Sequence, residues 1–202
     1  MKLVILERDG TINADGDPYI TSADDWTPLP GALDAIARLN HAGYHVVIAC
    51  NQPVLGRGLI DVATLNAIHA RMHKMLAAVG ARVDAVFYCP HTADDACTCR
   101  KPLPGLFEQI GERYGIDLED IPAVGDSLRD LEAGFAAGCR PHLVRTGKLA
   151  RAGEEAVAQV GEQVPGTQVH ADLAAFAEAL IQRERAARGQ SGEPASGYGH
   201  LE

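Results

Sequence analysis

The sequence predicts an α/β protein with a doubly wound, Rossmann-like parallel sheet. Six short apolar runs alternate with amphipathic stretches along the 202-residue chain, the pattern that builds parallel strands with helices on both faces. Polar and acidic residues follow directly after four of these runs. Because ligands bind beyond the carboxyl ends of parallel strands, we expect these four segments to meet at one edge of the sheet and to form the functional site.

The strands are predicted from runs of Val, Ile and Leu that are too short to be separate helices. In chain order they are 3–6, 45–49, 83–88, 121–124, 142–144 and 167–169, of which the last has the least pronounced pattern.

The helices are predicted from apolar residues at helical spacing. Leu33, Ile36 and Leu39 form one such stripe, and a longer stripe runs from residue 62 to residue 79. Gly115 and Gly138 stand where helices commonly end. The expected helices are 31–42, 61–79, 105–114, 128–137 and 171–185.

The length and composition suit one globular domain. Apolar residues make up 47% of the chain and charged residues 22%, and a chain of this length needs no disulfides to form a core. We expect one domain over 1–182. The segment 183–202 is Arg-rich and then Gly-, Ser- and Pro-rich without an apolar period, so we expect a disordered tail there.

The charge and the apolar pattern exclude several classes of protein. With 18 basic against 27 acidic residues the net charge is −9, which argues against nucleic acid or an anionic membrane as a partner. The longest apolar stretches have the length of a strand, far below the roughly 20 residues of a membrane span. The charged residues at 7–9 leave no room for a signal-peptide core. We therefore expect a cytoplasmic protein.

Acidic residues after the first and fourth strands predict a magnesium site. Glu7, Asp9 and Asp126, with Asp130 as a further candidate, would repel one another at one edge of the sheet unless a cation lay between them, and Mg²⁺ prefers such oxygen ligands. Lys101 supplies a positive charge that can hold a phosphate. Mg²⁺, a lysine and carboxylates together are suited to phosphoryl transfer.

A cysteine-rich segment predicts a structural zinc site. Three of the five cysteines lie within eleven residues that also contain a histidine, a spacing that matches a closed tetrahedral site in a reducing compartment. A bound zinc would fix a loop that has nothing apolar to bury and would present Arg100 and Lys101, which follow the last ligand. The four predicted ligands are Cys89, His91, Cys97 and Cys99.

Other conspicuous residues have simpler interpretations. His69 and His73 lie four positions apart, but no glutamate between them completes a zinc-protease motif, so we expect both on a solvated helix face. Trp26 is expected to anchor a loop. Cys139 is expected to be a small buried apolar residue.

Four segments together resemble the haloacid dehalogenase (HAD) superfamily of phosphatases. Within it, the chain looks like the zinc-containing heptose 1,7-bisphosphate 7-phosphatases over about residues 1–180. The segments are Glu-Arg-Asp-Gly-Thr-Ile-Asn at 7–13, Cys-Asn-Gln-Pro-Val-Leu-Gly-Arg-Gly at 50–58, Cys-x-Cys-Arg-Lys-Pro-x-Pro-Gly at 97–105 and Val-Gly-Asp-Ser-Leu-Arg-Asp at 124–130.

The resemblance implies a fold and an activity. The fold is a HAD-like sheet with the zinc loop in place of a large cap domain. The activity is Mg²⁺-dependent hydrolysis of the C7 phosphate of a sugar bisphosphate through an acyl-phosphate, in a cytoplasmic monomer that serves ADP-heptose and lipopolysaccharide core synthesis. A histidinol-phosphate phosphatase is the alternative, but Gly-Arg-Gly at 56–58 and the run at 100–105 favour the heptose enzymes.

The resemblance also implies the roles of individual residues. In the family one Asp attacks phosphorus and a second is the acid/base; Glu7 and Asp9 occupy these positions. Glu7, Asp126 and the backbone carbonyl of Asp9 would hold Mg²⁺, and Lys101 would hold the phosphate. The positions that bind substrate or phosphate are Cys50, Asn51, Gln52, Pro53, Arg57, Arg100 and Ser127, with a further contact from the turn at 15–18.

Three residues depart from the family pattern around the phosphoryl group. Glu7 replaces the nucleophilic Asp, Cys50 replaces a threonine and Pro53 replaces a serine. The extra methylene of Glu7 moves its carboxylate by about 1 Å, enough to slow the reaction about 10²-fold. We therefore expect a slowed phosphatase, a catalytically silent relative that binds a phosphorylated sugar or a protein partner, or an ordinary enzyme in which one or more of these residues was engineered.

Overall fold

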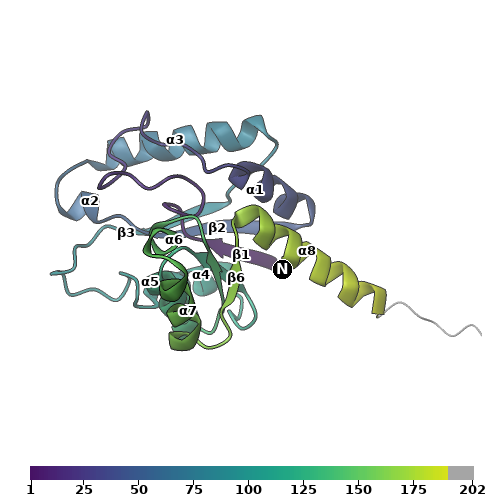
Figure 1. Cartoon of the computed structure of the whole chain (residues 1–202). Helices are drawn as coiled ribbons and strands as arrows, with labels where there is room; N and C mark the ends of the chain where they lie inside the picture. The colour runs from purple at the N-terminus through teal and green to yellow at the C-terminus, as the bar shows by residue number, and fades with distance from the viewer. Residues whose placement is uncertain (191–202) are drawn as a thin grey trace, which may run out of the picture.

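The computed structural model describes residues 1–190 and contains one parallel sheet of six strands (Figure 1). The strand order is β3-β2-β1-β4-β5-β6, so the order reverses beside β1. Such a reversal is where doubly wound sheets bind ligands. The strands are β1 Lys2–Leu6, β2 Tyr44–Asn51, β3 Ala85–Cys89, β4 Pro122–Gly125, β5 Arg140–Val144 and β6 Gln168–His170.

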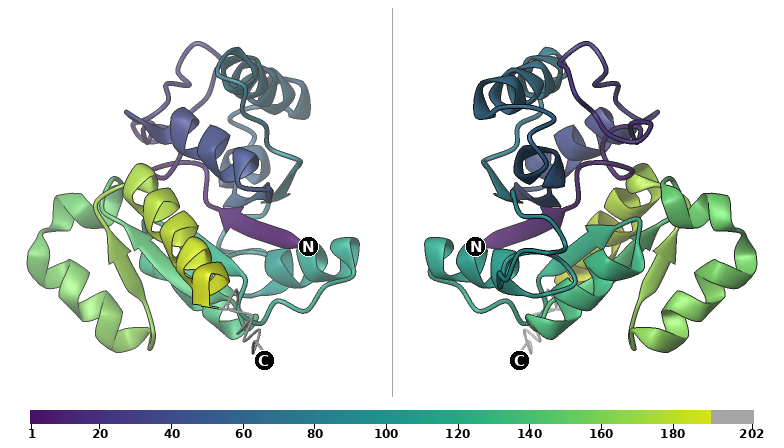
Figure 2. Two further views of the ribbon diagram at one scale, coloured as in Figure 1. Left: turned by 90° about the vertical axis from the view of Figure 1, so that its right-hand side faces the viewer. Right: turned by 90° about the vertical axis from the view of Figure 1, so that its left-hand side faces the viewer.

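Helices cover both faces of the sheet. Val4 and Leu6 of β1 pack into a core with α1, α3 and α8, whereas Leu3 and Ile5 pack against α4 and α5. This division follows from the strand geometry, in which successive side chains point to opposite faces. Figure 2 shows helices on both sides of the sheet. The helices are α1 Ala32–His41, α2 Pro53–Gly56, α3 Val62–Ala78, α4 Gly105–Tyr114, α5 Leu128–Ala136, α6 Lys148–Ala152, α7 Glu154–Gln163 and α8 Leu173–Gln190.

The predicted fold class is confirmed, and all six predicted strands and five predicted helices are present. Helices α2, α6 and α7 were not predicted from the sequence, because they are short or carry few buried residues. Within residues 1–190, no helix combines the length and the apolar character needed to cross a bilayer.

The prediction of a tail that starts at residue 183 is wrong for the described residues, because α8 continues to Gln190. The charged residues of this segment have partners that a local pattern does not reveal. Glu184 forms an ion pair with Lys2 of β1, and Arg183 Nη2 donates a hydrogen bond of 2.6 Å to Gln168 Oε1. Residues 191–202 lie outside the described part of the chain.

A pair of histidines joins β5, β6 and α8. The side chain of His142 is 2% exposed, its Nδ1 lies 3.0 Å from Nε2 of His170, and its ring contacts the edge of Phe176. Burial lowers the pKa of His142 to about 3, and burial also lowers the pKa of His170. The folded protein therefore holds a neutral His142 over the pH range in which an unfolded chain would protonate it.

This histidine should make the fold sensitive to acid. Above about pH 6.5, His142 is neutral in both the folded and the unfolded chain, so it adds no pH dependence to the free energy of unfolding. Between about pH 6.5 and about pH 3, only the unfolded chain binds a proton on His142. The free energy of unfolding should thus fall by up to about 1.4 kcal/mol per pH unit on acidification. Urea unfolding of the protein and of His142→Leu, at about pH 7 and about pH 5, measures the difference in slope. Equal slopes would show that His142 does not contribute.

Candidate active site

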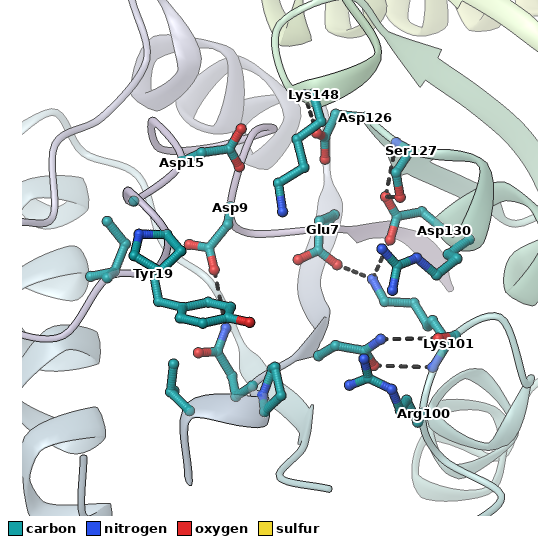
Figure 3. Close-up of a pocket in the computed structure, with 18 residues that line it drawn as sticks. Glu7, Asp9, Asp15, Tyr19, Arg100, Lys101, Asp126, Ser127, Asp130 and Lys148 are labelled. Atoms are coloured by element: carbon teal, nitrogen blue, oxygen red, sulfur yellow. Dashed lines mark hydrogen bonds and ion pairs between the residues drawn. The ribbon is translucent and has the colours of Figure 1, made fainter. Parts of the chain in front are cut away.

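A pocket lies beyond the carboxyl ends of the strands, as predicted (Figure 3). It is built from segments that follow β1, β2, β4 and β5 and from the segment that precedes α4. Both acidic and basic side chains line its wall (Figure 3). The residues that line it include Glu7, Asp9, Asp15, Tyr19, Asn51, Gln52, Pro53, Arg100, Lys101, Asp126, Ser127, Arg129, Asp130 and Lys148.

Lys101 is a buried cation at the base of the pocket. Its ammonium forms an ion pair with Glu7 and donates to Asp130 Oδ1 at 2.6 Å and to the backbone oxygen of Ala49 at 2.8 Å. The side chain of Asn51 fixes the backbone of Lys101. Its Oδ1 accepts from the Lys101 backbone N–H and its Nδ2 donates to the Lys101 backbone oxygen, both at 3.0 Å. All three ammonium N–H groups are therefore used by protein acceptors.

Glu7 directly follows β1, and its backbone N–H donates to Val124 O at 2.8 Å. Its carboxylate is 8% exposed and is turned toward Lys101. A phosphate that is to be held by Lys101 must take over one of the three hydrogen bonds that this ammonium makes. One of the three acceptors is the carboxylate of Glu7, the residue predicted to attack phosphorus. A bound phosphate and the Glu7 carboxylate would therefore compete for the Lys101 ammonium.

Asp9 accepts hydrogen bonds from three side chains. Arg8 donates from Nε at 3.0 Å and from Nη2 at 2.9 Å, Asn13 from Nδ2 at 2.9 Å, and Gln52 from Nε2 at 3.2 Å. Burial by itself would raise the pKa of Asp9, but the Arg8 guanidinium and these hydrogen bonds outweigh it and hold the pKa below its usual range. Asp9 is therefore ionised in this structure.

Asp126 follows β4 and is 4% exposed. Burial raises the pKa of its carboxyl to about 7, with further contributions from the charges of Asp130 and Asp15. A carboxylate that is buried among other carboxylates is stabilised by a cation, and hard oxygen donors of this kind suit Mg²⁺. The donor set predicted from the sequence, Asp126 with Glu7 and the backbone carbonyl of Asp9, fits that ion.

Two glycines enclose the Asp126 side chain. A Cβ atom at Gly147 or at Gly10 would overlap the Asp126 carboxylate, and Gly10 in addition has a φ of +80°. Thr146, beside Gly147, donates to the backbone oxygen of Gly10 at 2.7 Å and so ties the two glycine segments together. The position of the Asp126 carboxylate thus depends on the absence of side chains on both sides.

The Gly147→Ala variant should consequently bind Mg²⁺ about 10- to 100-fold more weakly, the range seen when the support of a metal ligand is lost. Calorimetric titration of the protein with Mg²⁺ measures the affinity. Gly161→Ala is the matched control, because Gly161 lies on the exposed side of α7 with no atom near its added Cβ. Unchanged Mg²⁺ affinity in Gly147→Ala would remove Asp126 from the metal site.

Ser127 caps the N-terminus of α5. Its hydroxyl donates to Asp130 Oδ2 at 2.7 Å, and its backbone N–H donates to the same oxygen at 3.1 Å. Asp130 contacts Lys101 through its other oxygen. The capping box therefore also orients the acceptor of the buried lysine.

The predicted zinc ligands come together after β3, and their donor atoms all lie within 4.8 Å of one another. Nδ1 of His91 is 3.4 Å from Sγ of Cys89 and 3.3 Å from Sγ of Cys99, and the sulfurs of Cys89 and Cys97 are 3.9 Å apart. In a tetrahedral zinc site with Zn–S bonds of about 2.3 Å, the sulfurs are about 3.8 Å apart. The cluster thus has the dimensions of a closed zinc site.

Two predicted substrate-binding residues are placed elsewhere. Neither Cys50 nor Arg57 is among the described residues that line the pocket. The thiol of Cys50 is completely buried, with its sulfur 3.8 Å from Phe87 O, because the side chain points into the core from β2. The Arg57 guanidinium lies 5.4 Å from the centre of the Tyr19 ring, and Tyr19 itself lines the pocket.

Five residues of the pocket wall were not predicted from the sequence: the apolar Ile20 and Val54, and the polar Tyr19, Arg129 and Lys148. Lys148 could have been predicted, because Thr146, Gly147 and Lys148 lie beyond the carboxyl end of β5, as Asp126 lies beyond the carboxyl end of β4. Arg129 lies in the first turn of α5, one turn from the predicted Asp126. Tyr19 lies in a long connection without periodicity, and its place depends on the tertiary structure.

The prediction of a solvated His69 is wrong. Its side chain is 9% exposed, and its Nε2 lies 3.1 Å from Nη1 of Arg8. His69 stands four residues after Leu65 and three before Met72, both of which are buried in α3. Helical spacing could therefore have placed it on the inner face, whereas His73 is exposed as predicted. Trp26 and Cys139 are buried, as expected.

Two family models match parts of this chain. Residues 98–176 match the family model described as HAD-hydrolase-like, and residues 2–134 match the model described as polynucleotide kinase 3 phosphatase. The chain is 56% identical to the D-glycero-beta-D-manno-heptose-1,7-bisphosphate 7-phosphatase of Bordetella bronchiseptica, over 90% of this chain and 99% of the relative. It is 50% identical to the enzyme of the same name from Pseudomonas aeruginosa, over 89% and 98% of the two chains.

Solved structures show the same likeness. The crystal structure of the heptose bisphosphate phosphatase from B. bronchiseptica, complexed with magnesium and phosphate, superposes with a TM-score of 0.84 over 91% of this chain and 99% of that one. The enzyme from Burkholderia thailandensis is 50% identical and superposes with a TM-score of 0.69, over 90% and 99% of the two chains.

Proposed function

The chain belongs to the HAD-like family of heptose-1,7-bisphosphate 7-phosphatases, and on that basis we propose that it removes the C7 phosphate of D-glycero-D-manno-heptose 1,7-bisphosphate in an Mg²⁺-dependent reaction. The observation that carries this proposal is the meeting of Glu7, Asp9, Lys101 and Asp126 in one pocket. These residues come from segments up to 119 positions apart, the separation between Glu7 and Asp126 (126 − 7).

In the first half of the proposed reaction, a carboxylate oxygen of Glu7 attacks phosphorus and Lys101 holds the phosphoryl oxygens. Asp9 gives a proton to the sugar oxygen as the P–O bond breaks, which leaves an acyl-phosphate on Glu7. Because Asp9 is ionised in the structure, it has to gain a proton before it can act as the acid in this step. The negative charge of a bound phosphate raises the pKa of a neighbouring carboxyl and favours that protonation.

In the second half, the ionised Asp9 removes a proton from a water molecule that attacks the acyl-phosphate, and phosphate leaves with Glu7 restored. When bound by Glu7, Asp126 and the backbone carbonyl of Asp9, Mg²⁺ supplies positive charge that stabilises the transferring phosphoryl group. Arg100, Arg129 and Lys148 supply further positive charge at the pocket wall and fit a substrate with a second phosphate.

The test is phosphate release from the α and β anomers of the heptose bisphosphate and from histidinol phosphate, with and without Mg²⁺. We expect Mg²⁺-dependent release from the heptose bisphosphate, which Asp9→Asn removes. Faster release from histidinol phosphate would reassign the substrate. Binding of the heptose bisphosphate without release would identify a catalytically silent binding protein.

We also propose that the cluster of Cys89, His91, Cys97 and Cys99 binds one structural Zn²⁺. The donor spacing supports this, and Arg100 Nη1 donates to His91 O at 3.1 Å, so the cluster and the pocket wall are connected. Thiolate ligands require a reducing compartment, which favours the cytoplasm. Because every residue of the proposed mechanism comes from this chain, we propose that a monomer with a single catalytic domain is active.

A further inference from the structure

Arg8 is a fully buried cation that lies directly behind the pocket. Its guanidinium binds both oxygens of the Asp9 carboxylate, through Nε at 3.0 Å and Nη2 at 2.9 Å. Nη2 also donates to Gln52 Oε1 at 3.3 Å. On the remaining side, Nη1 lies 3.1 Å from Nε2 of His69. The plane of the guanidinium is therefore fixed on one side by the acid/base residue and on the other by a histidine of α3.

The contact with Arg8 determines the form of the His69 ring. A guanidinium group has no acceptor, so His69 Nε2 has to accept the hydrogen bond and the ring proton has to be on Nδ1. Burial and the charge of Arg8 lower the pKa of His69 to about 4, in agreement with a neutral ring. A protonated ring could not accept and would repel Arg8.

The ring of His69 is itself held by packing. It lies on the buried face of α3 between Leu65 and Met72, and its centroid is 6.4 Å from that of Tyr88 on β3. A rotation of the Arg8 side chain would have to break the hydrogen bond to this buried ring. Because Arg8 and Asp9 are joined by two parallel hydrogen bonds, such a rotation would also turn the Asp9 carboxylate.

We propose that His69 is a positioning residue for the acid/base step: by accepting the hydrogen bond from Arg8 Nη1, it fixes the guanidinium and thereby aims the Asp9 carboxylate at the leaving-group oxygen. This inference rests on the acid/base role proposed for Asp9 above. Helix α3 contributes no side chain to the described pocket wall. Through His69 it would nevertheless take part in the chemistry of the site.

The proposal predicts that the effect of His69 depends on the leaving group. A sugar alkoxide is a poor leaving group and needs the proton from Asp9, whereas p-nitrophenolate leaves without one. Misalignment of Asp9 should therefore slow cleavage of the sugar phosphate much more than cleavage of p-nitrophenyl phosphate. General damage to the fold would slow both reactions alike.

The experiment compares kcat/KM for the two esters in the full chain and, in parallel, in its Glu7→Asp form. In His69→Leu we expect kcat/KM for the heptose bisphosphate to fall about 10²-fold, the cost of a misplaced catalytic group, and that for p-nitrophenyl phosphate to fall several times less. His69→Gln retains an acceptor for Arg8 and should recover most of the loss. His73→Leu, on the exposed face of the same helix, should match the parent.

Each contrary result has its own meaning. Equal losses on both esters in His69→Leu, or His69→Gln as slow as His69→Leu at equal thermal stability, would overturn the positioning role while the phosphatase assignment stands. No turnover of either ester in any form would overturn the proposed function and the positioning role with it. Nitrogen-15 NMR of labelled histidine is independent of activity: a ring proton on Nε2 of His69 would overturn the contact itself.

Discussion

Replacement of Glu7 by aspartate should raise the rate of phosphate release by about 10²-fold. The glutamate carries its carboxylate about 1 Å farther along the side chain than the family's aspartate, and a displacement of this size costs roughly that factor in rate. In the structure the carboxylate of Glu7 is paired with Lys101, whose other two ammonium contacts are with Ala49 and Asp130. A side chain that is one methylene shorter withdraws from the position in which the lysine has to meet a phosphoryl oxygen.

The measurement is phosphate release from the heptose bisphosphate at saturating Mg²⁺ by the chain and by Glu7→Asp. Glu108→Asp is the matched control, because it makes the same change on the exposed surface of α4 and should leave the rate unchanged. If the original chain is as fast as Glu7→Asp, the backbone accommodates the longer nucleophile and the 1 Å argument fails. If both are inactive, Pro53 at the start of α2 becomes the next position to restore.

Loss of a zinc ligand should unfold the loop that precedes Lys101 and abolish activity. In Cys99→Ser the site loses one of its four donors, and structural zinc sites bind with apparent free energies of about 10–16 kcal/mol, so even part of that loss is large for a domain of this size. Cys99 directly precedes Arg100 and Lys101, and the backbone of Gly105 donates to Thr98 O at 3.1 Å. Disorder in the loop should therefore reach Lys101, the residue that we propose holds the phosphate.

The check is the zinc content by elemental analysis, together with thermal unfolding and phosphate release. The parent should contain one zinc per chain, and Cys99→Ser should contain less and melt at a lower temperature. Acid or a chelator should have the same effect, because thiolates have to be deprotonated to bind the metal. Cys139→Ala is the control, since this buried cysteine lies outside the cluster. A parent that contains no zinc would contradict the assignment.

The sheet and most of the site were predictable from the sequence because both are encoded locally. The apolar runs predict strands whatever their partners, and the carboxyl ends of parallel strands lie at one edge, so Glu7, Asp9 and Asp126 could be brought together without a structure. The zinc cluster was predictable for a similar reason. Its four proposed ligands lie within eleven residues, and the donor types and their spacing predict zinc.

The contacts that tune the site were decided by the tertiary structure. Glu7 and Lys101 are 94 residues apart, and Arg8 and His69 are 61 apart, so no local pattern pairs them. Gly147 and Lys148 reach Asp126 only because β5 pairs with β4, and Glu184 of α8 forms an ion pair with Lys2 only because the fold brings the two side chains together. The periodicity of a chain determines which face of an element is buried. The packing of those faces against one another then decides which buried polar groups meet. These contacts in turn determine the charge of Asp9 and the acceptors that the Lys101 ammonium binds.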